Sequence, residues 1–196
     1  MNDSAQLRKE TLAARDRLIK EQQHAKSMVV CEFLLSLDAV KDSQNIFIYV
    51  NFRSEVETLQ CIKTLLAAGK QVTVPLTRVK EKRLDIIQLL DPDADLIPGY
   101  CGIPEPREEL AASRARAAKH LDVIVLPGSV FDLRGGRFGY GGGYYDRLLS
   151  QVPQAKRIAL AYELQIVDEL PLQKHDEILD CIVTEKRIIH AANRNR

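Results

Sequence analysis

The glycine- and tyrosine-rich run from Pro127 to Asp146 is the strongest candidate for a functional site in this sequence. It reads PGSVFDLRGGRFGYGGGYYD and opens onto an amphipathic helical pattern. Four of its glycines remove side chains, so that backbone N–H groups can approach a bound anion: Gly139, Gly141, Gly142 and Gly143. The N-terminus of the following helix adds partial positive charge. The run therefore predicts a loop that holds phosphate.

The spacing of this run differs from the two best-known phosphate loops. No Gly-Lys-Ser/Thr follows the glycines, and the preceding apolar segment lies too far from them for the dinucleotide fingerprint. Glycines also cluster in ordinary turns, and tyrosines at a helix start often pack in a core. The connection from Pro127 to Gly143 is 17 residues long. Compact domains keep few connections beyond about 12–15 residues unless these have a function, which favours a binding loop.

Length and composition indicate one globular domain spanning 1–196. The chain has 196 residues, of which 45% are apolar, enough for a sizeable core. Its 28 basic and 27 acidic residues give a net charge of +1, which provides no field to attract nucleic acid or an anionic membrane. We therefore expect small-molecule partners.

The cysteines and the N-terminus indicate a reducing, cytoplasmic compartment. Four widely spaced cysteines form no C-x-x-C pair, so we expect reduced thiols rather than disulfides or a zinc site: Cys31, Cys61, Cys101 and Cys181. The N-terminus lacks the apolar core of a signal peptide. The most apolar helical stretch, MVVCEFLLSL, is short and interrupted by Glu32, so no membrane segment is expected.

Hydrophobic periodicity predicts alternating helices and strands, with N-terminal helices over 4–37 and an α/β core over 45–190. Ser54 and Glu57 have the spacing of a capping box. The expected order is helices at 4–37, a strand at 46–50, a helix from Ser54 to near Gly69, strands at 72–75, 84–90 and 122–126, a helix after Gly143, a strand at 157–161, a last helix, and a strand from Cys181. Four prolines make 91–107 extended and irregular. This alternation predicts an α/β fold with a mostly parallel sheet.

Polar residues follow the predicted strands, where ligands of open α/β sheets collect. The loops after Val50, Pro75, Leu126 and Ala161 should share one rim. Glu55 at this rim is either a helix-start acid or a functional carboxylate. Asp146 would suit the start of any helix, and it would equally suit magnesium beside bound phosphates.

The run RFGYGGGYYDR, preceded by LPGSVFD and flanked by YVNFRSEVET, GIPEP and LPLQKHD, resembles the 5-formyltetrahydrofolate cyclo-ligase family over nearly the whole chain. The resemblance implies a single-domain three-layer α/β fold, similar to the NagB/RpiA/CoA-transferase-like fold. It also implies the conversion of 5-formyltetrahydrofolate to 5,10-methenyltetrahydrofolate, with ATP as co-substrate and Mg²⁺ as cofactor and with release of ADP and phosphate. We expect a cytoplasmic monomer that binds neither nucleic acid nor membranes.

The resemblance also implies roles for individual residues. The ATP contacts fall on Ser4, Arg8, Arg137, Phe138, Gly139, Tyr140, Gly141, Gly142, Gly143, Tyr144 and Tyr145. The folate contacts fall on Val50, Glu55, Tyr140, Gly141, Gly142, Gly143 and Tyr144. The magnesium ligands fall on Asp146 and Asp176. The family commonly has lysine where this chain has Ser4, so one phosphate contact differs.

The implied mechanism needs no protein nucleophile. Transfer of the γ-phosphoryl group to the formyl oxygen makes an imino phosphate, N10 attacks the same carbon, and phosphate departs. Tyr144 and Asp132 are candidates for assisting proton transfer, and Asp132 is equally a candidate for a hydrogen-bond partner within its own loop. Two alternatives stay open: a phosphosugar isomerase or transferase on the same fold, and a folate-binding protein without turnover.

Overall fold

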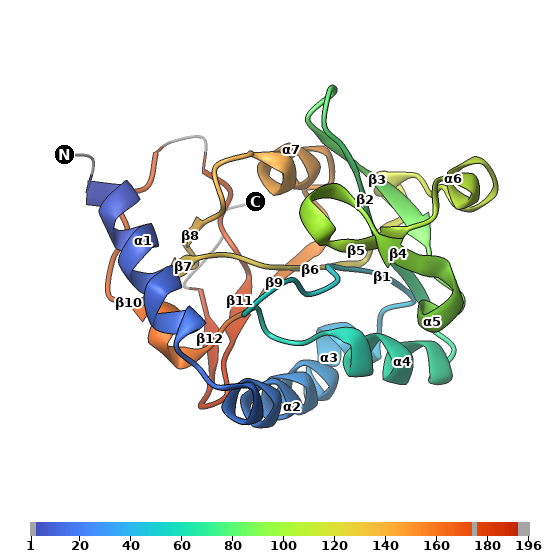
Figure 1. Cartoon of the computed structure of the whole chain (residues 1–196). Coiled ribbons are helices and arrows are strands. Elements are labelled where there is room, and N and C mark those ends of the chain that lie inside the picture. Colours follow the sequence, from blue (N-terminus) through green and yellow to red (C-terminus); the bar gives the residue numbers. More distant parts are fainter. Residues whose placement is uncertain (1–2, 174–175, 192–196) are drawn as a thin grey trace.

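A mostly parallel sheet forms the centre of the computed structural model, which describes residues 3–173 and 176–191 (Figure 1). The strands of this sheet, in spatial order, are β12 (Ile188–His190), β11 (Cys181–Val183), β9 (Lys156–Leu160), β6 (Val123–Leu126), β1 (Asn45–Ile48), β2 (Gln71–Arg78) and β3 (Arg83–Gln88). The edge strands β12 and β3 pair antiparallel with their neighbours, and the pairs between them are parallel. The predicted α/β fold with a mostly parallel sheet is confirmed.

Helices cover both faces of this sheet and make three layers (Figure 1). On one face lie α2 (Lys20–Ser36), α3 (Asp38–Lys41) and α4 (Leu59–Ala67), and on the other lies α7 (Tyr144–Gln151) with the 3-10 turn η2 (Ala118–His120). None of the helices in the described part of the chain has both the length and the apolarity that a membrane crossing requires.

The core lies on both sides of the central strands because their alternate residues face opposite layers. In β1, Ile46 and Ile48 pack with the α2 and α4 layer, whereas Phe47 packs with α7. In β6, Val123 and Val125 face the first layer, and Ile124 and Leu126 face the second. A strand buried on both faces is apolar throughout rather than alternating, as the DVIVL run predicts. All four cysteines are free, as expected, and three of them are buried in the core.

A second, smaller sheet supports the glycine-rich run. It consists of β10 (Ile166–Val167), β7 (Val130–Asp132) and β8 (Arg137–Phe138), and α1 (Asp3–Asp16) lies beside it (Figure 1). A hairpin of β4 (Leu96–Pro98) and β5 (Pro104–Pro106) lies in the proline-rich segment, together with α5 (Pro92–Asp95) and the 3-10 turn η1 (Tyr100–Gly102), and α6 (Glu108–Arg114) follows it. The connection from Pro127 to Gly143 is therefore built around the β7–β8 hairpin. The prediction that 17 residues separate one element from the next was wrong, because β7 and β8 lie inside this range.

The capping-box prediction at Ser54 was also wrong, because tertiary partners take both side chains. Helix α4 starts at Leu59, after Thr58. The Ser54 hydroxyl accepts a hydrogen bond from Arg15 at 3.0 Å and donates to Asp16. Glu57 pairs with His24 at 2.7 Å. Glu55 consequently lies in a non-helical loop, and the helix-start interpretation of this acid fails.

The helices at the two ends of the chain agree with the prediction only in part. The two helices predicted over 4–37 are α1 and α2, and the short helix α3 is an addition before β1. In place of the predicted last helix, the described residues after β9 form a 3-10 turn, η3 (Glu163–Gln165), and the strand β10. β10 pairs with β7 through Ile166 and Phe131, so its backbone groups form hydrogen bonds with another strand. A helix in this segment would lose those hydrogen bonds.

The buried carboxylate of Asp132 fixes the turn of the β7–β8 hairpin. Its Oδ1 accepts hydrogen bonds from the N–H groups of Arg134 at 3.0 Å and Gly136 at 2.7 Å. Its Oδ2 accepts from the Arg134 guanidinium at 2.9 and 3.1 Å and from the Leu170 N–H at 2.9 Å. The two oxygens are thus fully used inside the hairpin and its neighbour.

Replacing Asp132 with asparagine should destabilise the fold, because an amide NH₂ group would face buried donors. We expect Asp132→Asn to lower the free energy of unfolding by about 1–3 kcal/mol, measured by urea denaturation followed by circular dichroism. The exposed carboxylate of Asp168 provides the control, and Asp168→Asn should stay within about 0.5 kcal/mol. Equal midpoints and slopes for Asp132→Asn and the wild type would contradict this role.

Candidate functional site

A cavity of about 710 Å³ lies at the carboxyl ends of the central strands. Val50 follows β1, Pro127 follows β6, and Pro75 and Thr77 belong to the end of β2. These three strands meet at the predicted rim. The loop directly after Ala161 does not line the cavity, and Pro171, Gln173 and Asp176 line it in its place.

The glycine loop forms one wall of this cavity with backbone groups that have no partner. Every residue from Gly139 to Asp146 lines the cavity. None of their N–H groups donates a hydrogen bond to another described residue. Gly141 and Gly143 have φ angles of 91° and 64°, in the left-handed region that favours glycine. Gly143 is also the N-cap residue of α7. Free amides at a helix N-terminus are donors for an anion.

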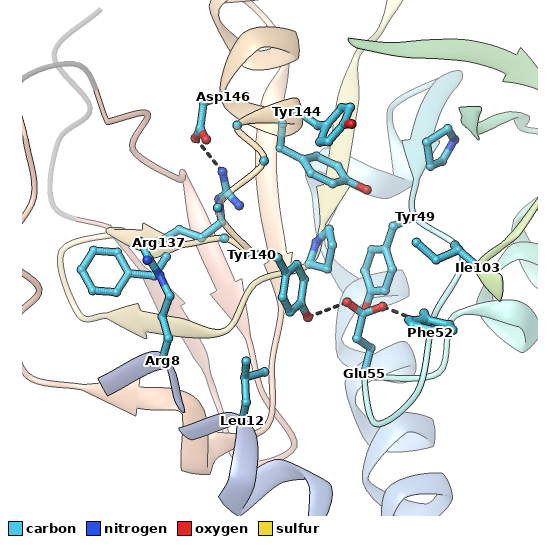
Figure 2. Close-up of a pocket in the computed structure, with 18 of the residues that line it drawn as sticks. Arg8, Leu12, Tyr49, Phe52, Glu55, Ile103, Arg137, Tyr140, Tyr144 and Asp146 are labelled. Atoms are coloured by element: carbon cyan, nitrogen blue, oxygen red, sulfur yellow. Dashed lines mark hydrogen bonds and ion pairs between the residues drawn. The ribbon is translucent and has the colours of Figure 1, made fainter. Parts of the chain in front are cut away.

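Two arginines bring positive charge to the same wall (Figure 2). Arg137 Nη2 donates to Asp146 Oδ1 at 2.6 Å, and the Arg137 side chain is only 3% exposed. Arg8, from α1, lies over the Phe138 ring, with its Cζ atom 4.7 Å from the ring centroid. The Nε atoms of both arginines are buried without an acceptor among the described residues. Unpaired charged donors beside free amides favour a polyanionic ligand such as a phosphate chain.

Two adjacent tyrosines and Ser4 occupy different parts of the same wall. The Tyr145 ring packs edge-on against Phe47, with ring centroids 6.4 Å apart. The Arg137 guanidinium lies over the same ring. The Tyr144 ring lies beside the Arg147 guanidinium, with Cζ 5.5 Å from the ring centroid. Ser4 lines the cavity from the first turn of α1. Nearby Lys9 is exposed and does not line the cavity, so a hydroxyl stands where the family commonly has an ammonium group.

A buried carboxylate, Glu55, forms the opposite side of the cavity (Figure 2). The Tyr140 hydroxyl donates to its Oε1 at 2.5 Å, and the Phe52 N–H donates to its Oε2 at 2.9 Å. Burial raises the pKa of Glu55, while these hydrogen bonds and the charge of Arg15 act against the shift. The Tyr140 residue is 52% exposed, but its hydroxyl is turned inward. Burial and the Glu55 charge raise the pKa of Tyr140, so its hydroxyl stays a donor at neutral pH.

Sequence reasoning missed Arg15, which donates from Nη1 to the Tyr140 hydroxyl at 2.9 Å. Its position two helical turns after Arg8 places both on one face of α1. That spacing was the signal available in the sequence. An arginine on a polar helix is usually solvated, so the spacing alone did not distinguish it.

Two further carboxylates line the cavity, Asp146 and Asp176. Asp176 Oδ2 accepts from the Gln173 N–H at 2.7 Å, and Asp146 Oδ2 accepts no hydrogen bond from a described residue. Within residues 3–173 and 176–191 no three His, Cys, Asp or Glu side chains gather as metal ligands. Mg²⁺ commonly uses one or two carboxylates together with phosphate oxygens and water, and this pair of residues fits that pattern.

Asp132 is not brought to the cavity. It is fully buried and does not line the site, so the structure places it as the internal hydrogen-bond partner of its own loop. Val50 and Phe138 do line the cavity, both largely buried.

Comparison with known proteins identifies consistent relatives. The model of the 5-formyltetrahydrofolate cyclo-ligase family matches residues 1–185. A 5-formyltetrahydrofolate cyclo-ligase of Haemophilus influenzae is 31% identical over 87% of this chain and 91% of its own length. The corresponding mouse protein is 29% identical over 86% of both chains. The NMR structure of 5,10-methenyltetrahydrofolate synthetase from Aquifex aeolicus is 31% identical, with a TM-score of 0.83, over 98% of this chain and 94% of that one.

The unpaired donors of the glycine wall predict that a free phosphate chain binds by itself. Arg137→Gln removes charged hydrogen bonds worth about 1.5–3 kcal/mol, so inorganic triphosphate should bind about tenfold more weakly or worse, as measured by isothermal titration calorimetry. The control Arg116→Gln makes the same charge change at an exposed arginine outside the cavity, and its affinity should stay within about twofold of the wild type. Equal losses in both variants would mean that only the overall charge matters.

Proposed function

The chain belongs to the 5-formyltetrahydrofolate cyclo-ligase family, and we propose that it converts 5-formyltetrahydrofolate to 5,10-methenyltetrahydrofolate in a reaction driven by ATP and Mg²⁺. The observation that carries this proposal is one cavity with two kinds of wall. Free amides and unpaired arginine donors lie on one side, and the buried Glu55 carboxylate lies on the other. A phosphate donor and a folate can therefore meet in a single enclosed site.

Folate recognition is assigned to the Glu55 side. A carboxylate accepts hydrogen bonds only, and the pterin ring of folate presents adjacent amino and N–H donors. Val50 and the segment from Tyr140 to Tyr144 complete this side of the cavity. Apolar and aromatic walls with a few placed polar groups are typical of sites for flat ring ligands.

ATP binding is assigned to the glycine wall. The amides from Gly139 to Tyr145 and the side chains of Arg8 and Arg137 would hold the phosphate oxygens, with Phe138 beneath Arg8. Ser4 would contribute a hydroxyl where the family commonly has a lysine. A hydroxyl brings no charge, so ATP should rely more on Arg8 and Arg137 in this chain.

Magnesium is assigned to Asp146 and Asp176. When bound, the ion would neutralise charge on the phosphate oxygens. Asp146 also pairs with Arg137, so the carboxylate links the metal position to the guanidinium that faces the phosphates. The ion pair orients both groups before any ligand arrives, which lowers the reorganisation needed for phosphoryl transfer.

The reaction then proceeds on the substrate. The formyl oxygen attacks the γ-phosphorus and ADP leaves, giving an imino phosphate. N10 attacks the activated carbon and loses its proton, and inorganic phosphate departs with the former formyl oxygen. The chain contributes position and charge rather than a covalent intermediate. Tyr144, at the cavity wall, is the candidate for assisting the proton transfer.

A monomer is the working unit in this proposal. The free thiols suit a reducing compartment such as the cytoplasm.

An absorbance assay for methenyltetrahydrofolate tests the proposed reaction directly. Product should form only when 5-formyltetrahydrofolate, ATP and Mg²⁺ are all present, because phosphoryl transfer to the formyl oxygen turns that oxygen into part of a phosphate leaving group. Product without ATP would contradict the mechanism. Folate binding without product under any condition would instead identify a binding protein.

Substitution of Asp146 tests the magnesium assignment. Asp146→Asn should raise the Mg²⁺ concentration that gives half-maximal rate by at least about tenfold, since even groups that only hydrogen-bond to metal ligands have effects of this size. Steady-state rates over a Mg²⁺ titration provide the measurement. Asp168→Asn, a change at an exposed carboxylate outside the cavity, should leave the titration unchanged. An unchanged titration for Asp146→Asn would remove this residue from the metal site.

A further inference from the structure

Arg15, on the last turn of α1, is a buried arginine between two parts of the folate side of the cavity. The residue is 4% exposed. Its Nε donates to Ser54 Oγ at 3.0 Å, and its Nη1 donates to the Tyr140 hydroxyl at 2.9 Å. Fully buried arginines are uncommon unless they are paired. The partners of this guanidinium therefore indicate its role.

The charge of Arg15 is balanced through hydroxyl groups rather than by direct contact. Among the ion pairs between described residues, none includes Arg15. The Tyr140 hydroxyl that accepts from Arg15 donates in turn to Glu55 Oε1 at 2.5 Å. On the other side, the Ser54 hydroxyl accepts from Arg15 and donates in turn to Asp16. A chain of hydrogen bonds thus runs from the guanidinium to the folate-side carboxylate.

Each Glu55 oxygen has one donor from the protein, Tyr140 for Oε1 and Phe52 for Oε2. An ionised carboxylate offers about four lone-pair sites, so each oxygen keeps capacity for one more donor. A ligand edge with two adjacent N–H groups matches that capacity. Protonation of Glu55 would remove part of this capacity to accept hydrogen bonds, because one oxygen would then carry a hydrogen.

We propose that Arg15 is a positioning residue for folate recognition, which holds Glu55 through Tyr140 in the orientation and the ionised state that accept the pterin N–H groups. This inference rests on the proposed function. Arg15 itself lines the cavity, and in the proposed role it acts on Glu55 through the Tyr140 hydroxyl.

The surroundings of Glu55 make the charge of Arg15 important. Burial raises the pKa of Glu55, and Arg15 is the cation whose charge opposes that shift. Four other titratable side chains lie in the surroundings of Glu55. They are Tyr49 at the end of β1, Tyr145 on α7, Tyr162 at the start of η3, and Asp16 on α1. Burial raises the pKa of each of these phenols, and a carboxyl group carries no positive charge in either protonation state, so neither kind of side chain can replace the guanidinium.

Equilibrium binding across pH separates this role from a purely structural one. The dissociation constant of 5-formyltetrahydrofolate is measured without ATP by isothermal titration calorimetry, from about pH 5 to about pH 8. Folate affinity should fall as the pH falls through the Glu55 pKa. In Arg15→Gln the fall should begin at higher pH, and affinity near neutral pH should be about tenfold weaker or worse. Arg15→Lys, which keeps the charge, should restore the pH profile toward that of the wild type.

Two further variants keep the test decisive. Arg17→Gln makes the same charge change at an exposed arginine just after α1 and should match the wild type. Tyr140→Phe removes the linking hydroxyl and leaves Arg15 in place, so it should shift the profile in the same direction as Arg15→Gln, even where Arg15→Gln itself fails to fold.

The outcomes distinguish this inference from the proposed function. Wild-type affinity in Arg15→Gln at every pH would overturn the inference alone. A constant loss factor with an unshifted pH profile would also overturn it, because that pattern indicates a structural role. Absence of 5-formyltetrahydrofolate binding by the wild type would overturn the proposed function and this inference together.

Discussion

Unpaired backbone N–H groups from Gly139 to Asp146 are the feature on which the proposed phosphate site depends. Such groups cannot be buried without a partner, so the surrounding structure has to keep them at the edge of a cavity. The β7–β8 hairpin does this, because the Asp132 carboxylate closes its turn. The α7 N-terminus holds the other end of the loop at Gly143. Ligand binding can then satisfy donors that folding leaves free.

Helix α1 connects the two sides of the cavity. Ser4 and Arg8 from its first half lie at the glycine wall, and Arg15 from its last turn lies at the proposed folate side. The Arg8 guanidinium packs on Phe138, which belongs to the hairpin that supports the loop. Docking of one helix therefore completes both proposed binding regions, and its displacement would open both at once.

Charge in the cavity is arranged in two separated pairs. Arg137 faces Asp146 directly at 2.6 Å, whereas Arg15 reaches Glu55 through the Tyr140 hydroxyl. The Glu55 carboxylate is buried, where an isolated charge would be unfavourable, whereas the Asp146 side chain is 43% exposed. The direct pair stands beside the proposed phosphates and metal. The indirect pair leaves lone pairs on Glu55 for a ligand, which suits recognition of ring N–H donors.

The layering, the central strands and the glycine loop could be predicted from the sequence, because apolar runs and glycine clusters act locally. The run from Asp122 to Leu126 is apolar throughout and is buried on both faces. The tertiary structure decided what local patterns left ambiguous. The spacing of Ser54 predicts a helix cap, but its hydroxyl binds Arg15. The sequence leaves Asp132 equally a candidate for proton transfer or for a hydrogen-bond partner of its own loop, and in the structure it closes a hairpin. Arg15 reads as a solvated charge and becomes buried because α1 packs against the cavity, a contact between segments far apart in the chain.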